Sequence, residues 1–151
     1  MAPASSNTAL TALAAFVAET PRAWSLPARE MAALAFCDVL AVAAAGRLSD
    51  VSVKAMALLH RPAGEAEIWW SDRTADEETA AFVNGVLAHA LDYDDVAPPW
   101  RGHPSAVIYP ALLATLPADW SAARGAELLD AYAVAFQLAA EVGQRMLPGH
   151  Y

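Results

Sequence analysis

The sequence has a single lysine, Lys54, and only nine basic residues against seventeen acidic ones. Its formal net charge is −8 and its pI is about 4.7. Nucleic acids and anionic membranes bind to basic protein surfaces. The acidic net charge therefore excludes general binding to nucleic acid or to an anionic membrane, and we expect neither as a partner. A small anionic substrate is not excluded, because its site needs only a few cations placed locally.

The chain also has only one cysteine, Cys37, which lies in an apolar helical stretch and cannot form an internal disulfide. A reducing compartment is the simpler interpretation, and we expect a cytoplasmic protein. Residues 1–6 show no basic segment leading into an apolar one, so a secretory signal is not supported. The most apolar run, residues 31–45, is too short to span a bilayer and contains Asp38. It predicts a core helix with a buried carboxylate, for which a structural hydrogen-bonding role is favoured over a catalytic one.

Hydrophobic residues make up 57% of the 151 residues, and alanine far outnumbers the β-branched types. This composition favours helices over sheets, and the length fits one domain with one core. Proline, glycine and capping residues divide the apolar pattern into six helices. The predicted caps are Asn7 or Thr8, Ser25, Asp50, Thr74, Ser105 and Ser121, and the helices end before Pro21, at Gly46, at Arg61–Pro62, near Leu91, at Ala114 and at Pro148–Gly149.

The expected fold is all-α, an antiparallel helical bundle of about six helices with at most one short strand pair near Ile68 to Ser71. Trp69 and Trp70 are interpreted as packing anchors. Gly85 predicts a close contact between helices, and Pro110 predicts a kink or the first turns of the fifth helix. The buried side of the fourth helix is expected to contain Phe82, Val83, Val86, Leu87, Ala90 and Leu91.

Polar residues are densest where the fourth helix ends. They are His89, Asp92, Tyr93, Asp94 and Asp95, followed after a Pro/Gly loop by His103, Pro104 and Ser105. Three carboxylates near a helix C-terminus interact unfavourably with the helix dipole and repel one another, so they destabilise the end of the helix. Helix stability therefore does not explain their presence. His89 and Asp92 are three residues apart, which predicts that they share a helical face.

His103 lies two residues before the predicted cap Ser105, where the positive end of a helix disfavours the imidazolium form. A neutral imidazole is what a general base requires. The alternatives are a structural histidine at position 103 and turn-forming roles for Asp94 and Asp95. Spacing alone does not separate these interpretations.

Two other chemistries fit the same letters. Residues 92–95 match the DxDD pattern with which some terpene cyclases protonate alkenes, although so short a pattern often occurs by chance. His89, Asp92, Asp94 and His103 also form a possible metal site with nitrogen and oxygen ligands. The chain lacks the His-x-x-x-His spacing that would favour a metal.

The order of three motifs resembles the signature of the MmgE/PrpD family, which includes 2-methylcitrate dehydratase and cis-aconitate decarboxylase. These motifs are NG, HxLDxDD and HPS, at Asn84–Gly85, His89–Asp95 and His103–Ser105, with Pro110–Ala114 following. Weaker similarity extends over the chain, at Asp38–Gly46 and at Gly149–Tyr151.

The resemblance implies a mostly helical domain joined to an α+β lid domain, often in a homodimer, with the active site between the two domains. Members dehydrate, decarboxylate or epimerise small polycarboxylates with no metal and no organic cofactor. Their catalytic lysines correspond to positions beyond Tyr151, and Lys54 does not match one. Residues 1–151 are therefore expected to be the helical domain alone, truncated before the lid.

By the same resemblance, Asp92 and His103 correspond to active-site residues. We expect His103 to transfer the proton and Asp92 to orient it or to position the substrate. Val96 stands where several members have threonine, so a hydroxyl that contacts substrate is missing. The residues expected to support the site are His89, Asp94, Asp95 and Ser105. Arg101 is a candidate for attracting a substrate carboxylate, and the alternative is that it is an exposed loop arginine with no part in the site. The competing hypothesis is an inactive helical fragment that serves as a dimerisation or interaction module.

Overall fold

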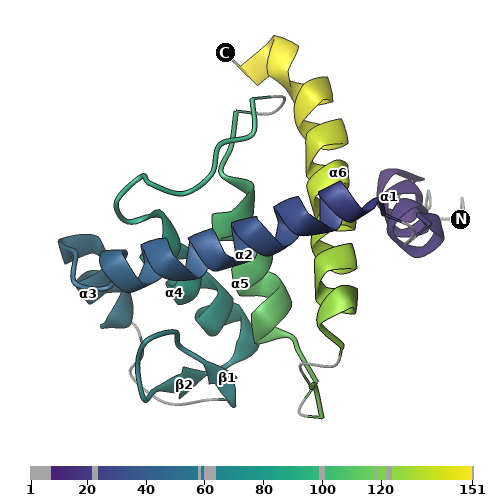
Figure 1. Cartoon of the computed structure of the whole chain (residues 1–151). Helices are drawn as coiled ribbons and strands as arrows, with labels where there is room; N and C mark the ends of the chain where they lie inside the picture. Colours follow the sequence, from purple (N-terminus) through teal and green to yellow (C-terminus); the bar gives the residue numbers. More distant parts are fainter. Residues whose placement is uncertain are drawn as a thin grey trace, which may run out of the picture.

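The computed structural model describes residues 8–21, 24–57, 59, 64–98, 101–117, 119–121 and 124–150, with side chains up to residue 146. Within these residues the fold is mostly helical, with one short antiparallel strand pair, as predicted (Figure 1). The elements are α1 (Thr8–Glu19), α2 (Leu26–Gly46), α3 (Asp50–Met56), β1 (Ala66–Glu67), β2 (Thr74–Ala75), α4 (Glu77–His89), α5 (Pro104–Ala114) and α6 (Gly125–His150).

Helix α2 has the predicted boundaries. The Ser25 hydroxyl accepts a hydrogen bond from the Ala28 amide, Pro27 lies in the first turn, and the helix ends at Gly46. It lies across α4, α5 and α6 (Figure 1) and contacts all three. The buried Tyr109 of α5 donates a hydrogen bond to the Ala32 carbonyl of α2 over 2.6 Å, which fixes the two helices together.

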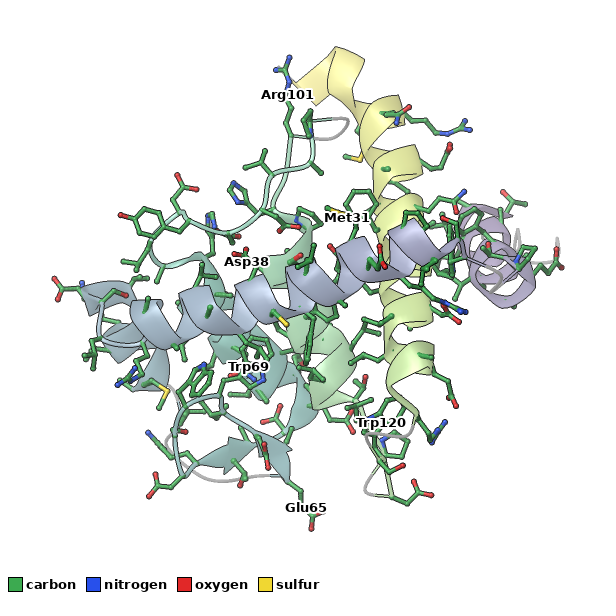
Figure 2. All side chains as sticks on the ribbon, in the orientation of Figure 1. Met31, Asp38, Glu65, Trp69, Arg101 and Trp120 are labelled. Carbon is green, nitrogen blue, oxygen red and sulfur yellow. The ribbon has the colours of Figure 1, made fainter. Side chains whose placement is uncertain are left out.

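The outer side of α2 contradicts the prediction of all-round burial. Asp38 is exposed rather than buried, and Met31 and Leu34 are 65% and 62% exposed. Figure 2 shows Met31 and Asp38 on the edge of α2 that faces the side of the molecule where Arg101 lies. The cause is that α4, α5 and α6 cover only the opposite side of the helix, so its remaining apolar face has no cover in the described chain.

Several helix ends differ from the prediction. Ser49 caps α3 through the Ser52 amide, whereas Asp50 was expected to do so. Asp76, and not Thr74, caps α4 by accepting a hydrogen bond from the Thr79 amide, because Thr74 belongs to strand β2. The third helix was expected to run to Arg61–Pro62, but α3 ends at Met56 with Ala57 as its C-cap residue. One of the two candidate caps of α1, Asn7, lies outside the described residues.

The last two helices also begin elsewhere than expected. His103 is the N-cap residue of α5, and Ser105 lies inside the first turn, with Pro110 within the helix. Helix α6 begins at Gly125 rather than just after Ser121, and it continues through Pro148. The strand pair was expected near Ile68 to Ser71, but its strands lie on either side of that segment, at Ala66–Glu67 and Thr74–Ala75, and residues 68–73 connect them.

Asn84 ties this turn to α4. Its buried side-chain amide accepts a hydrogen bond from the Trp69 backbone and donates one to the Glu67 carbonyl. Trp69 packs partly buried against the core, as predicted. Trp70 is 55% exposed, although its indole nitrogen donates to the Leu40 carbonyl.

The inner face of α4 makes two close contacts. Val83 and Leu87 are buried as predicted, but Phe82 and Leu91 are 57% and 37% exposed, and Leu91 lies beyond the end of α4 at His89. A Cβ on Gly85 would come 3.0 Å from the Ala106 carbonyl oxygen, which confirms the predicted close approach of another helix. A Cβ on Gly46 would come 2.4 Å from the Leu87 carbonyl oxygen.

Gly46→Ala is therefore expected to destabilise the protein by about 1–3 kcal/mol, the usual range for overpacking, since α2 and α4 must separate. Urea denaturation measures the effect. The matched control is Gly125→Ala, where the new methyl group would meet nothing within 4 Å. Equal stability of the two variants would contradict this close packing.

In the described part of the chain, no single helix is both long and apolar enough to cross a membrane. Helices α2 and α3 together meet the criterion by length and composition, but they are bent by 92° at the break between them.

Candidate functional site

The ends of α4 and α5 bring the predicted polar residues together. His89 is the last residue of α4, and His103 occupies the N-cap position of α5 without a side-chain capping hydrogen bond. The loop between them carries the carboxylates. The two imidazole rings lie 4.4 Å apart between centroids. His103 therefore stands at a helix N-terminus beside His89, as the sequence predicted for its position.

Asp94 lies between the two histidines. Its Oδ1 is 2.9 Å from His89 Nδ1, and its Oδ2 is 3.2 Å from His103 Nδ1. The side chain of Asp94 has no exposed surface, whereas those of His103 and His89 are 27% and 51% exposed. The contact between Asp94 Oδ2 and His103 Nδ1 does not have the geometry of a hydrogen bond. Neither atom has a hydrogen-bond partner among the described residues.

Asp92 occupies the open side of the cluster. Its Oδ1 is 3.6 Å from His103 Nε2, and its side chain is 78% exposed. The prediction that Asp92 shares a helical face with His89 is wrong, because α4 ends at His89 and Asp92 adopts a left-handed conformation with φ of 55°. That backbone turn is what directs Asp92 back toward His103.

A left-handed aspartate carries backbone strain that glycine avoids. We expect Asp92→Gly to raise the free energy of unfolding by about 1 kcal/mol, and the Tm by about 2–4 °C, while removing the carboxylate. Asp92→Asn is the control, since asparagine tolerates the same conformation and removes only the charge. A lower Tm for Asp92→Gly than for Asp92→Asn in thermal denaturation would contradict the inference that the backbone of Asp92 is strained.

The outer part of the loop turns back on itself. The Ala97 amide donates to the Gly102 carbonyl over 2.8 Å, and the Arg101 amide donates to the Ala97 carbonyl over 2.8 Å. Arg101, with φ of 50°, lies at the outer end of the loop in Figure 2.

A second network anchors the base of the loop to α5 and α6. Asp95 accepts hydrogen bonds from the Ser105 amide at 3.0 Å and from the Ser105 hydroxyl at 2.7 Å, which satisfies the N-terminus of α5. The Ser105 hydroxyl is also 2.9 Å from the Tyr132 hydroxyl, and the Tyr132 ring stacks on Tyr109 at 4.2 Å. Tyr132 was not singled out from the sequence, because it lies 37 residues from Asp95.

Burial raises the pKa of Tyr132 to about 12, and the negative charge of Asp95 adds to the effect. Above pH 10 the unfolded chain loses this proton while the folded chain keeps it to about pH 12, so stability should fall as the pH rises through this interval. Tyr132→Phe is expected to make the fall shallower but not to abolish it, because burial also raises the pKa of Tyr109. Urea denaturation between about pH 9 and pH 12 measures the slope, and identical slopes for the two proteins would contradict the assignment.

Hollows on the surface of the described residues include two that bear on the site. One of about 540 Å³ adjoins the loop, between α2 and α6, and is mostly apolar. Its lining includes Trp24, Met31, Asp95, Val96, Tyr132 and Phe136. The larger one, of about 1060 Å³, lies beside the strand pair and is lined by five carboxylates, those of Glu65, Glu67, Asp76, Glu77 and Glu78. Charge repulsion makes the larger hollow unsuitable for a polycarboxylate. The smaller hollow adjoins the loop, but its lining includes none of the residues His89, Asp92, Asp94 and His103.

His89, Asp92, Asp94 and His103 are also the residues that could hold a metal ion. One ligand atom from each lies within 4.8 Å of the other three. Asp95 and Ser105 are engaged with each other and with α6, so they support the loop rather than join this group.

The comparison with protein families gives an independent result. The family model of the MmgE/PrpD N-terminal domain matches residues 11–151, which is nearly the whole chain. No curated protein and no solved structure matches it. The match covers α2 to α6 and the whole polar cluster, and on this basis the chain belongs to the MmgE/PrpD family.

Proposed function

We propose that this chain supplies part of the active site of a lyase that dehydrates or decarboxylates a small polycarboxylate by acid–base proton transfer. The observation that carries the proposal is the position of His103, at the N-cap of α5 and in contact with two carboxylates. Membership of the MmgE/PrpD family supports the substrate class.

His103 is the proton-transfer residue of this proposal, through Nε2. Its Nδ1 is buried against Asp94, whereas its Nε2 lies toward Asp92 on the exposed side. In a dehydration, Nε2 would take the proton α to a carboxylate, and the electrons of that C–H bond would form the double bond as the C–O bond breaks. The hydroxide would leave as water with a proton from the solvent. In a decarboxylation, CO₂ would leave first and Nε2 would return a proton to the carbanion.

The carboxylates have different parts in this scheme. Asp94 is buried and contacts both imidazoles, so it is suited to orient His103 and to stabilise its protonated form. Asp92 is exposed and is suited to position the substrate. From the sequence, Asp92 was expected to orient His103 or to position the substrate. The burial of Asp94 favours Asp94 as the residue that orients His103.

Cationic groups are the missing part of the site. A polycarboxylate that develops carbanion character needs preorganised positive charge, and the four clustered residues include no lysine or arginine. We propose that a lysine-bearing lid domain provides it, and that the domain packs over the loop. The second candidate function is an inactive interaction module, which the exposed apolar face of α2 favours.

Ligand titration of the chain tests the location of the site. In imidazole NMR spectra, tricarballylate should shift the His89 and His103 resonances with a Kd in the millimolar range, because the lid cations are missing. Acetate at the same carboxylate concentration is the control and should leave them in place. Shifts confined to the other histidines, or no shift with tricarballylate, would contradict the proposal.

A further inference from the structure

The four clustered side chains resemble the ligand set of a metal ion. His89, Asp92, Asp94 and His103 each place one ligand atom within 4.8 Å of the others. Ligands bound to one Zn²⁺ at about 2.0–2.2 Å lie at most about 4 Å apart. Small side-chain movements would therefore bring the four atoms around one ion, and the exposure of Asp92 and His89 leaves room for them.

A second observation points to a missing cation. Asp94 has no exposed side-chain surface, and its Oδ2 accepts no hydrogen bond from any described residue. His103 Nδ1, 3.2 Å away, is buried and equally without a hydrogen bond. Buried polar atoms nearly always have partners, since leaving a carboxylate oxygen unpaired is costly. An ion bound between these two atoms would satisfy both.

Charge and ligand type identify the class of ion. With neutral imidazoles, Asp92 and Asp94 give the cluster negative charge, which attracts a cation. Two imidazoles with two carboxylates favour zinc, iron, cobalt or nickel over magnesium and calcium, which prefer oxygen alone. We propose that His89, Asp92, Asp94 and His103 bind one divalent transition-metal ion of the zinc class.

This ion would be an inhibitory ligand and not a cofactor. With an ion on Nδ1 of His103, the single proton of the neutral imidazole lies on Nε2, so Nε2 has no lone pair with which to accept the substrate proton. Metal binding is measured without turnover, so the outcome of this test does not depend on the proposed lyase function.

Metal titration tests the site. The chain, without a histidine tag and stripped with a chelator that is then removed, is titrated with Zn²⁺ by calorimetry and with Co²⁺ by visible absorption. One ion per chain is expected, with a rise in Tm and with Mg²⁺ binding at least about 100-fold more weakly. No Zn²⁺ binding at micromolar concentrations, or equal affinity for Mg²⁺, would overturn the proposal.

Single substitutions locate the ligands. His89→Gln should weaken Zn²⁺ binding by more than about 100-fold, because losing even an outer partner of a ligand costs about 10–100-fold. Since His89 is half exposed, this variant is expected to fold, and circular dichroism checks it. The controls are Cys37→Ser and Glu65→Gln, an exposed thiol and an exposed carboxylate outside the cluster. Unchanged affinity in His89→Gln, or loss of binding in a control, would assign the ion to another site.

Discussion

His103→Ala is expected to lower turnover by about 100-fold or more in the enzyme formed when this chain is completed by a lid domain. The imidazole at the N-cap of α5 is the proposed proton-transfer group, and loss of general acid–base catalysis costs about 10²–10⁴-fold. The loss should fall on kcat, because the proton is transferred only in the reacting complex.

Steady-state kinetics on a panel of small polycarboxylates measures this effect. His60→Ala is the matched control, since it removes a histidine outside the motif. Asp94→Asn provides a second variant, because it leaves His103 in place and removes only the buried charge that orients it. Turnover within a few fold of wild type in His103→Ala would remove this residue from the mechanism.

The isolated 151-residue chain is expected to show no lyase turnover toward cis-aconitate or 2-methylcitrate. Its clustered residues provide carboxylates and imidazoles but no lysine or arginine to stabilise a carbanion. The cluster is also open to water on the side of Asp92, whose side chain is 78% exposed, which weakens the charge interactions on that side.

The same chain should bind a hydrophobic dye or self-associate. The apolar hollow between α2 and α6 adjoins an α2 face on which Leu26, Met31 and Leu34 are all more than 60% exposed. Uncovered apolar area of this kind is a binding surface in most proteins. Dye fluorescence and light scattering measure it, and Met31→Glu, which charges this face, should reduce both signals. Robust turnover by the monomeric chain would show that the site is complete without a lid.

Local signals were enough to predict much of the fold. Ser25, Pro27 and Gly46 bound α2 by rules that depend only on neighbouring residues, and Gly85 indicated a close helix contact. Thr74 was mistaken for a cap because its spacing to Glu77 fits a capping box, whereas its pairing in β2 depends on a segment elsewhere in the chain.

Features set by packing were not predictable in the same way. An apolar helix with no polar face indicates burial on every side, so Asp38 was expected to be buried, whereas the described residues leave it exposed. The motifs identified the residues of the cluster but not their arrangement. That Asp94 bridges the histidines depends on the left-handed turn at Asp92, and that Tyr132 supports Ser105 depends on how α6 packs.

Proton exchange at the substrate is the most direct test of the central claim that His103 moves a proton at the carbon α to a carboxylate. The completed enzyme is incubated with a polycarboxylate in D₂O, and proton NMR follows the α-hydrogen of substrate and product. Wild type should introduce deuterium at that carbon, and His103→Ala should do so at least about 100-fold more slowly while His60→Ala matches wild type. Deuterium incorporation at the wild-type rate in His103→Ala, or a decarboxylation product with no deuterium at that carbon, would contradict the account.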